Sequence, residues 1–130
     1  MKNNLYRDNS NLYKSIITFI HCIRGRFNLK NSVKFIVKSR DEFDLHFQKL
    51  NSIYDYENNN QCIVVKTLNP DFSILLSSVS LIVTLRGHAL SHLAIVAKEK
   101  GITVIKIDED FEKIPRKGRI ILKNDMIEIF

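Results

Sequence analysis

Three short and nearly unbroken apolar runs constrain the fold of this 130-residue chain. They lie at 62–66, 80–84 and 102–107, and β-branched residues dominate them. Runs of this length without polar alternation are typical of strands that are buried on both faces, as in parallel sheets. The sequence therefore predicts a strand at each of these three positions.

Helix signals separate these predicted strands. Asn69 is a cap that is followed by Pro70 at a first helical position, which indicates a short helix through residue 76. A second helix is expected over 91–100, and Gly101 can end it in the left-handed conformation. Strands that alternate with short helices predict a compact α/β layer fold.

The segment before the central strands predicts one further strand and one helix. Residues 32–37 place Val33, Phe35 and Val37 on one face of a strand. Residues 40–50 follow as an expected helix with Asp41 as N-cap. Its apolar face would carry Phe43, Phe47 and Leu50.

Turn residues predict the remaining connections. The run 55–60 has the composition of a surface loop. A short turn is expected at 112–114. Strands at 119–122 and 126–129 would then form a hairpin about Asn124–Asp125.

The N-terminal region differs from the rest in charge. Residues 1–40 carry nine basic side chains and one acidic one, while residues 41–130 carry eleven basic and thirteen acidic. An amphipathic helix is expected from Leu12 to Ile23, either packed on its own domain or docked on a partner. A basic arm can bind phosphates, but a solvated segment explains the charge as well, so we do not expect nucleic acid as a partner.

Neither a disulfide framework nor a metal site is expected. Cys22 and Cys62 are forty residues apart, and His21 and His46 have no neighbours at ligand spacing. The longest apolar run, from Ile16 to Ile23, is far shorter than the roughly 20 residues of a membrane span. With no signal-peptide pattern either, we expect a cytoplasmic protein.

His92 is the residue in this pattern that points to chemistry. It follows the glycine-containing loop 85–90 and lies in the first turn of the helix that Ser91 begins. Unpaired N–H groups and the positive dipole end favour an anion there, and Gly87 lets the loop backbone approach it. Because imidazole is a nucleophile, the arrangement suits a histidine that carries a phosphoryl group. A structural or capping histidine would show the same pattern, so both interpretations stay open here.

The wider sequence around His92 carries an ordered motif. It contains Ile82-Val83-Thr84, Gly87, Ser91-His92, Ala94-Ile95, Ala97-Lys98 and Gly101-Ile102. This order resembles the signature of the phosphohistidine swivelling domain, the mobile domain of phosphoenolpyruvate synthase, pyruvate phosphate dikinase and related enzymes. The segment Asn69–Phe72 is similar to the family's T-D-P-D-W segment. The resemblance covers roughly residues 30–130.

The resemblance implies a fold and a role. The expected fold is a compact swivelling β/β/α domain over 31–130, preceded by a basic extension with an extra amphipathic helix over 1–30. In this family the histidine is phosphorylated at an ATP-grasp nucleotide site. The domain then swings to a TIM-barrel site and exchanges the phosphoryl group with pyruvate or phosphoenolpyruvate. By position, the phosphorylated nucleophile is His92, and its phosphate neighbourhood comprises Thr84, Arg86, Gly87, His88 and Ser91.

The resemblance also implies partners. No P-loop, ATP-grasp segment or barrel fits within 130 residues, so we expect one component of a dikinase-like phosphotransferase and not a complete enzyme. The implied partners are separately encoded nucleotide-binding and phosphoenolpyruvate- or pyruvate-binding proteins. ATP and Mg²⁺ would be bound by the nucleotide-binding partner, and no cofactor or metal by this chain alone.

Six positions depart from the family pattern and keep a second hypothesis open. This alternative is a non-catalytic interaction or regulatory module that retains the fold, and phosphorylation of His92 discriminates the two. His88 could be a second proton donor beside the phosphate or a surface residue, and we favour the surface residue. The departures are Leu68 for threonine, His88 for the second glycine, Leu90 for threonine, Lys98 for arginine, Thr103 for proline and Lys106 for glycine.

Overall fold

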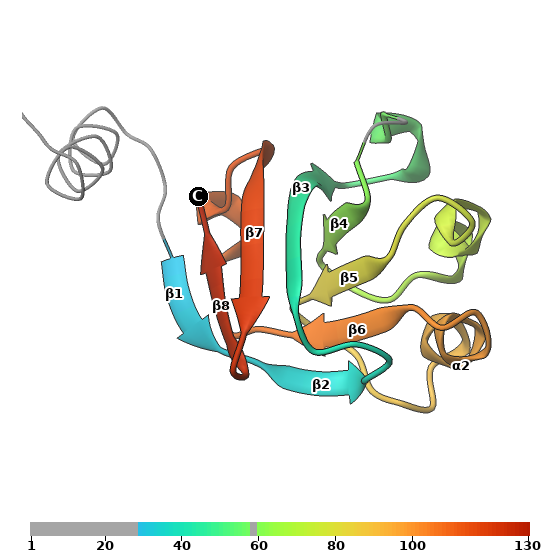
Figure 1. The fold of residues 1–130 in the computed structure, drawn as a ribbon. Helices are drawn as coiled ribbons and strands as arrows, with labels where there is room; N and C mark the ends of the chain where they lie inside the picture. Colours follow the sequence, from blue (N-terminus) through green and yellow to red (C-terminus); the bar gives the residue numbers. More distant parts are fainter. Residues whose placement is uncertain (1–28, 58–59) are drawn as a thin grey trace, which may run out of the picture.

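The computed structural model describes residues 29–57 and 60–130, which form one eight-stranded mixed sheet with few helices (Figure 1). The predicted helix Leu12–Ile23 lies outside the described residues, and the boundary between residues 30 and 31 stays a prediction. The strands are β1 (Leu29–Ser32), β2 (Lys34–Val37), β3 (Phe43–Leu50), β4 (Cys62–Val65), β5 (Leu81–Thr84), β6 (Thr103–Lys106), β7 (Lys117–Lys123) and β8 (Met126–Ile129). The helical segments are α2 (His92–Glu99) and the 3₁₀ turns η1 (Ile53–Asp55), η2 (Pro70–Leu75) and η3 (Phe111–Lys113).

A single bent segment closes this sheet. The strand order is β1-β8-β7-β3-β4-β5-β6-β2, so β1 and β2 stand at its two ends. Only Val33 separates them in the chain, and Figure 1 shows β1 running directly into β2. β1 pairs with β8 and β2 pairs with β6, both antiparallel, while the Val33 N–H donates to the Asp125 carbonyl at 3.0 Å. The sheet is therefore barrel-like, with its two edge strands joined covalently.

The central strands are parallel and confirm the three predicted ones. β3, β4, β5 and β6 pair in parallel, and their carboxyl ends align at Leu50, Val65, Thr84 and Lys106. Every residue of β4 and β5 is buried. This double burial explains why the two sequences show no polar alternation.

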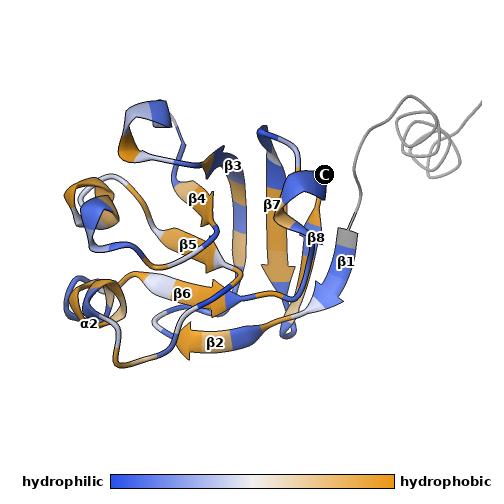
Figure 2. Cartoon of the chain, turned by 180° about the vertical axis from the view of Figure 1, so that it is seen from behind, coloured by the Kyte–Doolittle hydropathy of each residue, from blue (hydrophilic) through white to orange (hydrophobic). Residues whose placement is uncertain are grey.

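Two apolar cores account for the burial. Inside the barrel, one core contains Phe47, Val64 and Ile105. On the outer face, Ile82 and its neighbours pack against η2 and α2, for example against Leu93. Figure 2 shows hydrophobic residues along β4, β5 and β7, and hydrophilic ones in β1. The sheet thus buries both faces where helices cover it, as in an α/β layer fold.

The predicted helix over 40–50 is wrong, because residues 43–50 form β3. Phe43 and Phe47 are both buried, and their four-residue spacing fits a helix face as well as one face of a strand. Leu45 between them packs on the same interior core, which is the two-residue period of a strand. Pairing with β4 and β7 on either side overrides the local helix pattern. Asp41 consequently caps no helix.

The predicted face of strand 32–37 is right for two residues and wrong for the third. Val33 and Phe35 pack against the interior core. Val37 belongs to the outer core, because the register between β2 and β6 shifts between Phe35 and Val37. Such a bulge moves all following side chains to the opposite face.

The other connections follow the prediction with one exception. η3 occupies the expected turn, and the β7–β8 hairpin turns at Asn124 and Asp125, whose φ angles are 55° and 60°. The run 55–60 is not wholly a surface loop, because Asn60 is buried. The buried Gln48 side chain holds this loop: its oxygen accepts from the Glu57 N–H at 2.8 Å and its amide donates to the Asp55 carbonyl.

Substitution of Gly118 on β7 can test how closely the interior of the barrel is packed. A Cβ at this position would overlap the Phe130 carbonyl oxygen and lie 2.9 Å from Cε2 of Phe47. We expect Gly118→Ala to lower the free energy of unfolding by about 1–3 kcal/mol, measured by urea denaturation. Gly101→Asn is the control, because Gly101 has open space around it and asparagine tolerates its φ of 75°. Equal stability of Gly118→Ala and the parent would contradict this packing.

Asp44 on β3 and Arg119 on β7 form an ion pair with two hydrogen bonds, of 2.7 and 2.6 Å. The hydrogen bond from Arg119 holds the pKa of Asp44 below its ordinary value. The pair therefore stabilises the fold above the unfolded-state pKa, and this contribution is lost as the pH falls through the lower folded-state pKa.

We therefore expect Asp44→Asn to be less stable than the parent at neutral pH, with the difference in unfolding free energy vanishing under strongly acidic conditions. Thermal unfolding across the acid range measures this difference. Asp41→Asn serves as control, because Asp41 is exposed and has no ion pair within the described residues. A difference that is independent of pH would refute the electrostatic origin.

Candidate functional site

The loop that leads to His92 starts at the carboxyl end of β5 and is fixed there by Thr84. The buried Thr84 hydroxyl donates to the Arg86 carbonyl at 2.6 Å and accepts from the Arg86 N–H at 3.3 Å. The Arg86 N–H also donates to the Lys66 carbonyl at 3.1 Å, which ties the loop to the segment after β4. The backbone at the start of the loop is thus held from two sides.

Gly87 is required next in the loop for two separate reasons. Its φ is 145°, a value that side chains rarely permit. A Cβ would also lie 2.6 Å from Cδ1 of Leu68, a buried residue just after β4. Leu68 and Gly87 therefore pack the two neighbouring loops closely together.

The loop ends at a capped helix that begins with His92. Ser91 is the N-cap of α2: its side-chain oxygen accepts from the Ala94 N–H at 3.3 Å, and its carbonyl accepts from the Ile95 N–H at 3.1 Å. The His92 side chain is exposed. Within the described residues, the N–H groups of His92 and Leu93 donate no hydrogen bond, so two donors of the first turn remain for a ligand.

A comparison with protein families decides what this loop and helix belong to. The family described as PEP-utilising enzyme, mobile domain, has a sequence model that matches residues 58–125. The chain belongs to this family. The match spans the loop, the cap and His92, and membership implies a phosphohistidine carrier role in general, in concert with partner domains. A search of curated proteins gives no match to the chain.

In this mobile domain the six predicted site residues lie in one continuous segment, 84–92, but they differ in availability. Arg86 and His88 are exposed. The hydroxyls of Thr84 and Ser91 are already engaged, in the loop and in the helix cap. The phosphate neighbourhood therefore stays a prediction for each of them, and Thr84 has in addition a structural task that the sequence did not indicate.

One residue that the sequence analysis left out of the site shapes this loop. Lys66 accepts the Arg86 N–H through its carbonyl, while its ammonium lies 5.9 Å from the ring centre of Phe111. A second cation, Lys49, lies 4.8 Å from the same ring. The position of Lys66 as the last residue of the predicted strand 62–66 was the available signal, since ligand sites form at the carboxyl ends of parallel strands.

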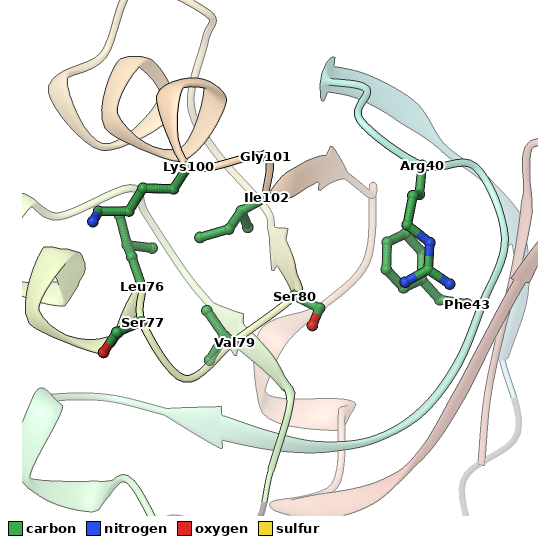
Figure 3. Close-up of a pocket in the computed structure, with 9 residues that line it drawn as sticks. All are labelled: Arg40, Phe43, Leu76, Ser77, Val79, Ser80, Lys100, Gly101 and Ile102. Atoms are coloured by element: carbon green, nitrogen blue, oxygen red, sulfur yellow. The ribbon is translucent and has the colours of Figure 1, made fainter.

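A separate cavity lies at the opposite end of α2 from His92. It has a volume of about 450 Å³, and its lining includes Lys100, Gly101 and Arg40. Figure 3 shows Lys100 and Arg40 on opposite sides of it, with the Arg40 guanidinium beside the ring of Phe43. The guanidinium lies 4.6 Å from that ring centre. Because the cavity is at the wrong helix end, it is not part of the histidine site.

Of the other cysteines and histidines considered from the sequence, Cys62 and His46 lie within the described residues. Cys62 is buried, and burial raises the pKa of its thiol, which makes it unreactive. His46 is exposed on β3, and His21 and Cys22 lie outside the described residues. Within residues 29–57 and 60–130, no three His, Cys, Asp or Glu side chains could hold a metal ion together, and no helix has the length and apolarity of a membrane span.

Thr84 provides a test of how the loop is held. Thr84→Val keeps the shape of the side chain but removes the hydroxyl that bonds Arg86, and we expect a loss of about 1–3 kcal/mol in unfolding free energy. Amide hydrogen exchange at Arg86 should accelerate as well. Thr84→Ser, which keeps the hydroxyl, is the control and should retain slow exchange. Unchanged exchange in Thr84→Val would show that the hydroxyl does not hold the loop.

Proposed function

We propose that this domain is a phosphoryl carrier that accepts the group on His92. The observation that carries the proposal is the exposed imidazole at the first position of a capped helix, in a chain of the mobile-domain family. Neutral imidazole has an in-plane lone pair and is a competent nucleophile toward phosphorus. An exposed position lets it enter the active sites of other proteins.

The transfer requires two displacement steps. In the first, a ring nitrogen of His92 attacks the phosphorus of the donor, and the bond from phosphorus to the leaving oxygen breaks with its electron pair on that oxygen. In the second, an acceptor oxygen attacks the phosphorus, the nitrogen–phosphorus bond breaks, and the imidazole is restored. The group carries its charge on its oxygens throughout, so catalysis depends on positioning and electrostatic stabilisation.

The structure supplies groups that suit this charge. The N–H groups of His92 and Leu93 are donors at the positive end of the helix dipole. Arg86 adds an exposed cation in the same loop, and guanidinium geometry matches phosphate oxygens. Thr84 and Gly87 act indirectly in this proposal, since they set the course of the loop between Arg86 and Ser91.

The proposed partners supply the remaining parts of the reaction. A separately encoded ATP-grasp protein would bind ATP and Mg²⁺ and exchange the phosphoryl group with His92. A second protein would bind pyruvate or phosphoenolpyruvate as the other reactant. The domain itself would be one component of a phosphotransferase and would bind no cofactor of its own.

Phosphoryl labelling tests the carrier function. The purified protein is incubated in extract of its source with isotope-labelled ATP or phosphoenolpyruvate, and we expect an acid-labile, alkali-stable label. His92→Ala should remove all of it, whereas His46→Ala and His88→Ala, matched imidazole deletions, should retain a phosphohistidine label.

Two outcomes would contradict the proposal. A label that persists in a folded His92→Ala protein would place the phosphoryl group elsewhere. No label on the parent from either donor would favour the non-catalytic module that keeps the fold. Circular dichroism of each variant establishes that it is folded.

A further inference from the structure

Two lysines face each other across the pairing of β2 and β6. Lys34 and Lys106 are direct partners in this antiparallel ladder, and directly opposed residues share one face of a sheet. Their side chains are therefore neighbours of like charge, an arrangement that destabilises a sheet. Within the described residues, neither ammonium has a carboxylate oxygen within 4.0 Å.

Both lysines line the same cavity. Its volume is about 520 Å³, within the range of small-molecule sites. Ser32 and Asp108 also line it, and Asp108 is the one acidic residue of the lining. Two lysines against one acidic residue leave an excess of positive charge in the lining; Lys106 is partly exposed to water and Lys34 is exposed. An anion in the cavity would relieve the repulsion between the lysines.

The cavity lies at the carboxyl edge of the parallel strands. Lys106 is the last residue of β6 and is aligned with Thr84, the last residue of β5. Leu85, the first residue of the loop that leads to His92, belongs to the lining as well. Ligands of sheets with parallel strands bind at such edges.

We infer that this cavity is a binding site for a phosphate group, held between the ammonium groups of Lys34 and Lys106. The Ser32 hydroxyl is a further donor to the phosphate oxygens. The source of the group is free phosphate or a small phosphate monoester, both of which the cavity volume admits. The site is independent of phosphoryl transfer to His92, which does not line the cavity.

The cavity beside Arg40 and Lys100 does not offer the same arrangement. Its two cations lie on opposite sides, and Arg40 is already stacked on Phe43 (Figure 3). The C-terminal end of α2, the negative end of the helix dipole, also lies at that cavity, which disfavours an anion. Lys34 and Lys106 are the better supported pair.

Thermal unfolding of the full chain tests the inference. Inorganic phosphate and glycerol 3-phosphate are titrated separately against sodium chloride at matched ionic strength, since a ligand of the folded state raises the unfolding temperature by mass action. We expect a saturable rise with phosphate. A rise with glycerol 3-phosphate at lower concentration would identify a monoester as the source, and the reverse order would identify free phosphate.

Four variants locate the effect. Lys34→Gln and Lys106→Gln should each weaken phosphate binding by about tenfold or more, because each removes a charged hydrogen-bond donor. Without phosphate both should unfold at the same temperature as the parent or higher, since the repulsion is gone. Lys123→Gln removes an exposed lysine on β7 and should bind as the parent does. Asp108→Asn should bind more tightly.

The outcomes that overturn the inference are clear-cut. Equal rises with phosphate and chloride in the parent would exclude a site, and an undiminished rise in both lysine variants would place binding elsewhere. His92→Ala should keep the saturable rise. Loss of labelling in that variant and loss of phosphate binding in the lysine variants are thus separate results.

Discussion

Closure of the sheet by one bent segment is the constraint on which the rest of this structure depends. Because only Val33 separates β1 from β2, the two strands at the ends of the sheet cannot move apart. The hydrogen bond from Val33 to Asp125 fixes the bend against the β7–β8 hairpin. The strands around the interior core are then held at fixed distances. The close approach of Phe47 and the Phe130 carbonyl to Gly118 shows how little space remains inside the barrel.

The site inherits its geometry from this framework through backbone contacts. The loop before His92 is held by the Thr84 hydroxyl, by the carbonyl of Lys66 and by the packing of Leu68 on Gly87. All of these groups are near the carboxyl ends of β4 and β5, whose register the closed sheet fixes. The imidazole of His92 is therefore exposed, while the backbone that carries it is held in place. This combination suits transfer between partners.

The central part of the fold could be predicted from the sequence because its strands are buried on both faces and its helix has a cap at each end. β3 could not, since the spacing of Phe43 and Phe47 fits a helix and a strand equally, and long-range pairing decided between them. Val37 faces the outer core because of a bulge that no local pattern indicates.

The site likewise has parts that the sequence predicts and parts that depend on long-range contacts. His92 and Gly87 could be selected as candidates from the order of strand, loop and helix. In contrast, the engagement of the Thr84 hydroxyl and the opposition of Lys34 to Lys106 depend on contacts that only the folded chain defines.

The pairing of β1 with β8 has a mechanical consequence. Leu29 lies opposite Ile129, so the chain enters and leaves the barrel side by side. Anything attached to either end is therefore tethered at one corner of the barrel. Rotation of the whole barrel about that corner needs torsional changes in the connections alone and breaks no pair of the sheet.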